Sequence, residues 1–217
     1  MIVLFNPSSG KRVGVPYSMP EYRPSSQCHG YVDLKSNPED IKLLPEIKSG
    51  FGELRRMLIL LNGRRSLFQT FQTIGCDVSF GPSDTPIFKR KLTSWFNVVY
   101  EPLDWNQSPG NFEGLFRSCE EFIRSKGGSP DTYGVEFSIG YATFNDHRID
   151  EHSVICGFHV CVWNHGYGKD STSARREWAK GINIIYEFFE REIVAHPSDQ
   201  FSGLRKVSVR KSEDLAS

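Results

Sequence analysis

Residues 156–172, CGFHVCVWNHGYGKDST, are the part of the chain whose residue types come closest to a chemical site. The segment contains two cysteines and two histidines, which are residue types that bind zinc. It ends in two glycines followed by a lysine, a serine and a threonine, a composition that suits a phosphate group. A metal site and an anion-binding loop are therefore the two alternatives, and the secondary structure of the segment decides between them.

The first half of this segment is predicted to be a β-strand. Apolar side chains alternate along 152–163, at Val154, Cys156, Phe158, Val160 and Val162. Because successive side chains of a strand point to opposite faces, the even-numbered residues should face a core. The odd-numbered residues should lie together on the other face: His159, Cys161, Trp163 and His165.

The same alternation excludes a four-ligand zinc site. Cys156 points away from His159 and Cys161, and His159 and His165 are about 20 Å apart at a rise of about 3.3 Å per residue. The ligands of a tetrahedral zinc ion lie within a few ångströms of one another. A three-ligand site of Glu136, His159 and Cys161 is the arrangement that the spacing leaves, and we predict no metal site, no cofactor and no catalytic residue.

Glu136 joins this face through a second predicted strand, 133–144. The apolar residues of that strand are odd-numbered, so Glu136 lies on the reverse face. If the apolar sets of both strands share one face, paired residue numbers add to an odd total. That register places Glu136 opposite His159 or Cys161, and it predicts a binding face made of Glu136, His159, Cys161, Trp163 and His165.

The second half of the segment, 166–172, is predicted to be a turn that enters a helix. Backbone N–H groups at a helix N-terminus favour an anion, and here Gly166 and Gly168 would shape the turn. The donors would come from the residues that follow, Lys169, Ser171 and Thr172. An ordinary turn with a serine or threonine N-cap explains the same residues. The segment is not a Walker A motif, because Trp163 stands where that motif has its first glycine.

The remaining pattern predicts an α+β fold. Helical spacing of apolar residues occurs at 54–61, 67–74, 112–123 and 174–193, and strand-like runs occur at 92–103, 133–144, 152–163 and 204–210. From residue 92 onward the order is strand, helix, strand, strand, helix, strand. This order predicts an antiparallel sheet with helices on one face and a ferredoxin-like split βαβ core over about 92–210.

Three parts are expected along the chain: a proline-rich irregular arm (1–50) packed on the rest, a single α+β domain (51–210) and a flexible tail (211–217). Six prolines between residues 7 and 45 oppose a long helix or a central strand there. Residues 1–74 either cover the face that carries the histidines or leave it open as a groove. The apolar helices predicted within 54–74 favour covering, since they need a surface to bury.

The composition restricts the partners. Twenty-six basic residues balance twenty-six acidic ones, which disfavours nucleic acid and an anionic membrane surface. No apolar run approaches the length of about 20 residues that spans a membrane, and the first residues lack a signal-peptide pattern. Five cysteines, an odd number, argue for reduced thiols, and we expect a cytoplasmic protein.

These observations predict a soluble, non-catalytic module that binds another protein. Sixteen phenylalanines, eight tyrosines and four tryptophans exceed the evident need of one small core, and aromatic residues anchor interfaces. The size and organisation are similar to those of immunity or inhibitor proteins that neutralise a toxin. The alternative is a small enzyme or sensor that binds a phosphate-bearing molecule through 166–172. Either type could form a homo-oligomer.

Overall fold

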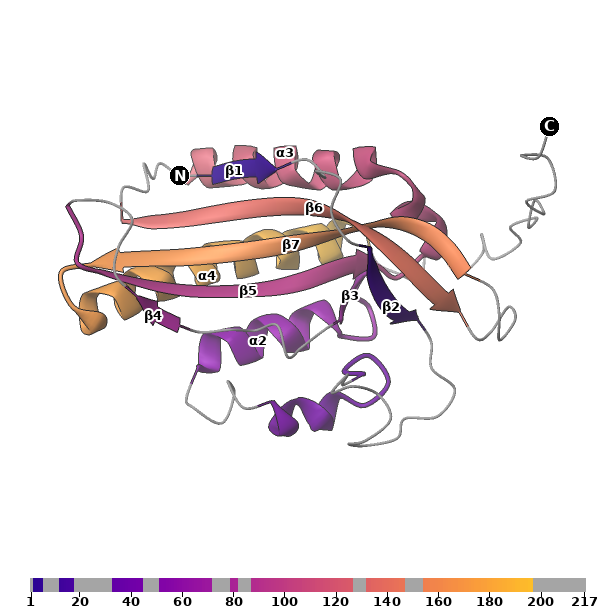
Figure 1. Cartoon of the computed structure of the whole chain (residues 1–217), viewed down its shortest axis with the longest axis horizontal. Helices are drawn as coiled ribbons and strands as arrows, with labels where there is room; N and C mark the ends of the chain where they lie inside the picture. Colours follow the sequence, from indigo (N-terminus) through magenta and orange to yellow (C-terminus); the bar gives the residue numbers. More distant parts are fainter. Residues whose placement is uncertain are drawn as a thin grey trace.

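A mixed β-sheet of seven strands forms the centre of the molecule (Figure 1). The computed structural model describes residues 2–5, 12–17, 33–44, 51–71, 79–81, 87–126, 132–146 and 154–196. The three long central strands are β5 (Arg90–Tyr100), β7 (Val154–Gly168) and β6 (Tyr133–Asp146). β7 lies between β5 and β6 and is antiparallel to both.

Short strands form the two edges of this sheet. Beyond β6 lie β1 (Ile2–Phe5) and β2 (Val13–Tyr17), which pair with successive parts of β6 in parallel. Beyond β5 lie β3 (Phe68–Phe71) and β4 (Ser79–Gly81), which pair with it antiparallel. The predicted antiparallel pairing is confirmed for the neighbouring long strands, and the parallel β1/β2 edge, which was not predicted, makes the whole sheet mixed.

The helices are α2 (Gly52–Leu61), α3 (Pro109–Ser125) and α4 (Ser171–Ala195), with short 3-10 helices η1 (Pro38–Leu43) and η3 (Leu103–Gln107). All three α-helices contribute to one apolar core on one face of the sheet, and α4 runs behind β7 in Figure 1. The largest fully buried side chain of this core is Trp178 of α4. The α+β class and the placement of the helices on one face are confirmed.

The ferredoxin-like topology stays a prediction. The unit β5–α3–β6 has β7 between its two parallel strands, as a split βαβ unit requires. However, β3 and β4 occupy the far side of β5, where the fourth strand of that fold would lie. The strand predicted at 204–210 lies outside the described residues, as does the tail 211–217.

The helix predicted at 67–74 is wrong, because residues 68–71 form β3. Phe68 and Phe71 are three residues apart, which is a helical spacing. In a strand this spacing sends the two rings to opposite faces, and each meets an apolar cluster: Phe68 the main core, Phe71 a second cluster of Val15, Phe71, Val99, Ala142 and Phe144. Both faces of the sheet are thus apolar at this edge, and periodicity alone could not separate strand from helix.

The described parts of the first fifty residues belong to the same sheet and core. β1 and β2 are edge strands, and an edge is where a strand tolerates Pro16. Leu34, Ile41 and Leu44 join the main core beside α2. The boundary predicted at residue 50 stays a prediction, whereas the apolar packing of 33–44 on the helices is observed.

Lys35 fixes the turn between α2 and β3. Its Nζ donates hydrogen bonds to three backbone carbonyls, those of Gly63 (3.1 Å), Ser66 (2.7 Å) and Phe68 (3.1 Å). Burial lowers the pKa of Lys35 to about 8, against the opposing effect of Glu101 and Asp33, so the ammonium is charged at pH 7. One side chain therefore satisfies three main-chain acceptors of this turn.

Replacing Lys35 with methionine is expected to lower the free energy of unfolding by about 2 kcal/mol, because buried carbonyl oxygens lose their donor. Urea unfolding followed by tryptophan fluorescence measures this change. Lys42→Met, at an exposed position of η1, is the matched control and should leave the midpoint unchanged. Equal midpoints for the two variants would show that the three hydrogen bonds contribute nothing.

Candidate binding face of the sheet

The face of the sheet opposite the helices carries the residues that the sequence singled out, and we call it the histidine face. Strand register places Glu136 of β6 directly opposite Trp163 of β7, and Trp163 directly opposite Trp95 of β5. We call these three residues the Trp–Glu row. The expectation that paired numbers add to an odd total is confirmed, but the predicted partners of Glu136, His159 or Cys161, are wrong. Strand parity leaves the register undetermined, because a shift by two residues keeps every side chain on the same face.

His165 links this row to β5. Its Nε2 lies 3.3 Å from Oε1 of Glu136, and its Nδ1 lies 3.0 Å from Oγ1 of Thr93. The side chain of His165 is 5 % exposed and that of Glu136 is 27 % exposed. The approach of Nε2 to Oε1 does not have hydrogen-bond geometry, so a buried imidazole lies beside a carboxylate that is itself partly open to solvent.

Aromatic rings continue along β7 from this point. The rings of Trp163 and His165 are 6.3 Å apart and nearly parallel, at 19°, and His165 and Tyr167 are again 6.3 Å apart. Trp95 lies 5.5 Å from Trp163, and Nζ of Lys91 lies 5.7 Å from the centre of the Tyr167 ring. Sequence analysis missed Thr93, Trp95 and Lys91, because it assigned no faces to the strand-like run at 92–103.

His159 lies at the covered end of the histidine face. Its ring packs against Gly140, where an added Cβ would come 3.0 Å from Cε1, and meets Phe71 edge-on at 5.3 Å. It is 6 % exposed, and Nδ1 has no hydrogen-bond partner among the described residues. Burial lowers the pKa of His159 to about 4, so the imidazole is neutral at pH 7.

The cover at this end comes from edge strands and the 3-10 helix η3 rather than from α2. β2 and β3 supply Val15 and Phe71 to the second apolar cluster, on the same face as His159. The expectation that helices of 54–74 cover this face is wrong, because α2 packs against α4 in the main core. Within residues 1–74, the described segments cover His159 and leave the Trp–Glu row partly exposed.

Cys161 is not an activated thiol. It is 8 % exposed, and burial raises its pKa to about 12, so the thiolate that nucleophilic attack needs is not formed at neutral pH. Cys119, inside α3, is fully buried with a raised pKa for the same reason. Within the described ranges no three His, Cys, Asp or Glu side chains are placed to hold a metal ion.

Gly166 and Gly168 belong to β7 and not to a loop, which corrects the turn predicted at 166–172. A Cβ on Gly166 would overlap the backbone of Trp178 and Ala174, and one on Gly168 would overlap Ala174 and Ser173. These two glycines therefore allow the first turns of α4 to approach the strand closely. Close helix packing, rather than the shape of a turn, explains them.

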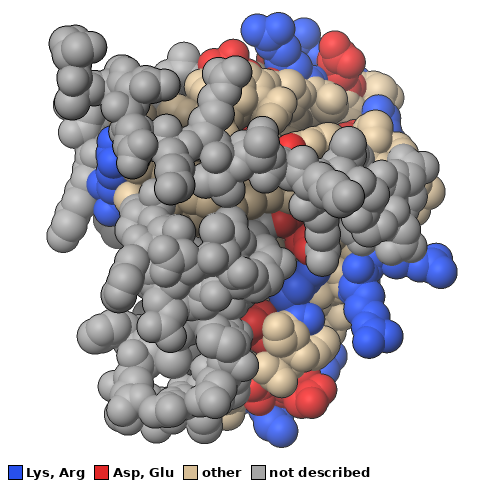
Figure 2. All heavy atoms as spheres, turned by 90° about the vertical axis from the view of Figure 1, so that its right-hand side faces the viewer, with Lys and Arg blue, Asp and Glu red and all other residues tan. Residues whose placement is uncertain are grey.

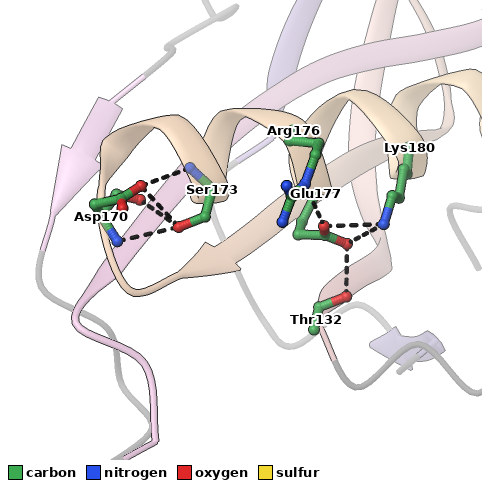
Figure 3. Close-up of polar contacts among 6 residues, drawn as sticks. All are labelled: Thr132, Asp170, Ser173, Arg176, Glu177 and Lys180. Atoms are coloured by element: carbon green, nitrogen blue, oxygen red, sulfur yellow. Dashed lines mark hydrogen bonds and ion pairs between the residues drawn. The ribbon is translucent and has the colours of Figure 1, made fainter.

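The N-terminus of α4 already holds a negative charge, that of Asp170 (Figure 3). Its carboxylate accepts a hydrogen bond from the backbone N–H of Ser173 at 2.7 Å, and the Ser173 hydroxyl accepts one from the backbone N–H of Asp170 at 3.1 Å. Hydrogen bonds from the backbone and side chain of Ser173 lower the pKa of Asp170. Lys169, Ser171 and Thr172 are exposed beside it. The carboxylate thus occupies the position at which a bound phosphate would meet this helix.

Asp170→Ala is expected to lower the melting temperature by about 3 °C, because the helix loses its N-cap. Asp170→Asn should retain the melting temperature, since asparagine is an equally good cap. Differential scanning calorimetry at pH 7 measures both. A large loss in the asparagine variant would mean that the charge, rather than the hydrogen bond, stabilises the helix.

A buried carboxylate further along α4, that of Glu177, ties the helix to the start of β6 (Figure 3). It accepts hydrogen bonds from Thr132 Oγ1 at 2.7 Å, Lys180 Nζ at 2.9 Å and Arg176 Nε at 3.1 Å. Burial alone would raise the pKa of Glu177, but the hydrogen bonds from Lys180, Thr132 and Arg176 lower it. The carboxylate is used in hydrogen bonds that attach α4 to the start of β6. We therefore assign this cluster a role in positioning α4 and not in the candidate site.

No protein family, curated protein or solved structure matches the chain. The helices in the described part of the chain are too short or too polar to cross a membrane. The side chains of the histidine face are therefore the basis for a functional assignment.

Proposed function

We propose that this protein is a non-catalytic module that binds another protein, of the immunity or inhibitor type, through the Trp–Glu row. One observation carries the proposal: two half-buried tryptophans, Trp95 and Trp163, stand beside the partly exposed carboxylate of Glu136 on a sheet face. Tryptophan is among the residues most enriched in binding hot spots. A sheet backbone that is already ordered reduces the entropic cost of presenting these side chains to a partner.

The state of the reactive groups supports binding over catalysis. The thiol of Cys161 and the imidazole of His159 are both neutral at pH 7, and both are nearly buried. Asp170 occupies the helix terminus that the phosphate-binding alternative requires. An enzyme built on these residues would lack both a nucleophile and an anion site.

The surface charge favours a protein over a polyanion as the partner. The side of the molecule seen in Figure 2 shows Lys and Arg interspersed with Asp and Glu in its described part. The chain as a whole has as many basic as acidic residues. Cys119, Cys156 and Cys161 are free thiols, which suits a reducing compartment, and we propose the cytoplasm as the site of action.

Photo-crosslinking tests this function. p-Benzoylphenylalanine replaces Tyr167, at the end of the aromatic strip, and Tyr186 on α4 provides the matched control on the helix side. In the native cell, irradiation is expected to give one discrete adduct with the variant at position 167 and none at position 186. Absence of an adduct at 167, or the same adducts at both positions, would contradict the proposal.

A thermal-shift screen against nucleotides, phosphosugars and divalent metal ions tests the alternative. We expect no change in melting temperature with any of them. Saturable stabilisation by a phosphate compound that Lys169→Ala abolishes would overturn the binding-module proposal. It would favour a small enzyme or sensor instead.

A further inference from the structure

We propose that the Trp–Glu row is a receptor for an arginine side chain of the partner protein. This inference rests on the proposed function and specifies the chemistry that the partner must offer. The guanidinium would pair with the carboxylate of Glu136 and stack on the indole of Trp163, with Trp95 beside it.

The carboxylate of Glu136 lies beside the His165 ring without a hydrogen bond to it. Its Oε1 meets Nε2 of His165, and Thr93 holds the other nitrogen of the same ring. Oε2 has no hydrogen bond within the described ranges, and about a quarter of the side chain, 27 %, is exposed. A partly exposed carboxylate complements a cation and repels an anion.

The aromatic surface beside this carboxylate contacts no cation of the described residues. Lys91 lies over Tyr167 at the end of the strip, 5.7 Å from its centre. No described Lys or Arg stacks on Trp95 or Trp163. Both indoles are half-buried, so a cation from outside can reach their exposed parts beside the carboxylate, with His165 and Trp95 flanking the Trp163 ring.

The molecule already contains the same combination in an internal contact. The guanidinium of Arg175 lies 4.6 Å from the Phe51 ring and 4.5 Å from the Trp178 ring, while its Nη2 binds Glu53 at 2.7 Å. One arginine thus satisfies two aromatic rings and a carboxylate at once. The Trp–Glu row has the rings and the carboxylate, and the partner would supply the arginine.

The indole N–H groups add donors for the backbone of the partner. Nε1 of the buried Trp178 donates to Ser94 Oγ at 2.8 Å. Trp95 and Trp163 have no such bond within the described part of the chain. An indole N–H that becomes buried normally finds an acceptor. When a partner covers Trp95 and Trp163, we therefore expect these two donors to bind carbonyl oxygens of the docked segment.

Indole ¹⁵N–¹H spectra of the full chain test the inference, because each of its four tryptophans gives one resonance. The probe is N-acetylarginine amide at constant ionic strength, and N-acetylcitrulline amide, of the same shape but uncharged, is the control. The resonances of Trp95 and Trp163 are expected to shift saturably with arginine, with a dissociation constant on the order of 10 mM. Those of Trp105 and Trp178 should not move.

Glu136→Gln is expected to weaken this binding at least fivefold, whereas Glu113→Gln on α3 removes the same charge away from the row and should not. Equal shifts with arginine and citrulline, or no shift of Trp95 and Trp163 in the wild type, would overturn the inference. The crosslinking experiment at Tyr167 does not depend on arginine. An adduct there without an arginine response would refute this inference alone, and loss of both would refute the proposed function as well.

Discussion

Gly166→Ala is expected to lower the free energy of unfolding by about 3 to 5 kcal/mol. The added methyl group would overlap the backbone nitrogen of Trp178 and the carbonyl oxygen of Ala174. Both atoms belong to the backbone of α4 and cannot rotate away as a side chain would. The helix must therefore move off the strand, and the burial of Trp178 is lost with it.

Urea unfolding measures this change, and Gly114→Ala is its matched control. Gly114 lies inside α3 with no atom within 4 Å of an added Cβ. Alanine there should raise the free energy of unfolding by about 1 kcal/mol through helix propensity. The two variants make the same chemical change, so opposite signs isolate the close contact. A small effect at Gly166 would mean that α4 does not approach β7 as closely as described.

The seating of α4 also connects the core to the candidate site. Asn164 of β7 donates a hydrogen bond from Nδ2 to the carbonyl of Trp178 at 2.9 Å, and Gly181 leaves room for its Oδ1. Trp163 and His165 are the chain neighbours of Asn164 and point to the opposite face. The contacts of Asn164 and Gly166 with α4 therefore also position the neighbouring residues of β7, including Trp163 of the Trp–Glu row.

Strand parity was enough to predict which candidate residues share a face. Glu136, His159, Cys161, Trp163 and His165 lie together because burial on one face imposes a period of two on the sequence. Parity could not give the register, since a shift by two residues along either strand preserves every face. Covering of His159 was expected, but from helices; the ring that covers it, Phe71, comes from a strand that the helical spacing of its apolar residues disguised.

The glycines at 166 and 168 show a different limit. A Gly-x-Gly pattern before a helix is compatible with a turn and equally with a strand on which a helix packs closely. The close approach of residue 178 to residue 166 distinguishes the strand from the turn, and this distance can be known only from the three-dimensional structure. The N-cap at Asp170 could have been predicted from the sequence. An aspartate followed three residues later by a serine is a local pattern that indicates the start of a helix.

The protein is expected to lose about 3 kcal/mol of stability as the pH falls from 6.5 to 4, because His159 is buried in its neutral form. Its pKa is about 4 in the folded state, while an unfolded histidine titrates near 6.5. Between these values the unfolded chain binds a proton that the folded chain does not. Stability is therefore complete above about pH 6.5 and declines with falling pH until His159 is protonated in the fold as well.

Urea unfolding from pH 8 to pH 5 measures this decline, which should reach about 2 kcal/mol at pH 5. His159→Leu removes the titrating group while filling the space beside Gly140, so its stability should be nearly independent of pH over the same range. His196→Leu, at the exposed end of α4, should keep the wild-type slope. Carboxylates such as Glu53, whose pKa is lowered by Arg175, contribute below about pH 5, and the His159→Leu difference separates them. If wild type and His159→Leu have the same slope, the imidazole has found a hydrogen-bond partner and the covered end of the histidine face is more open than its packing against Phe71 implies.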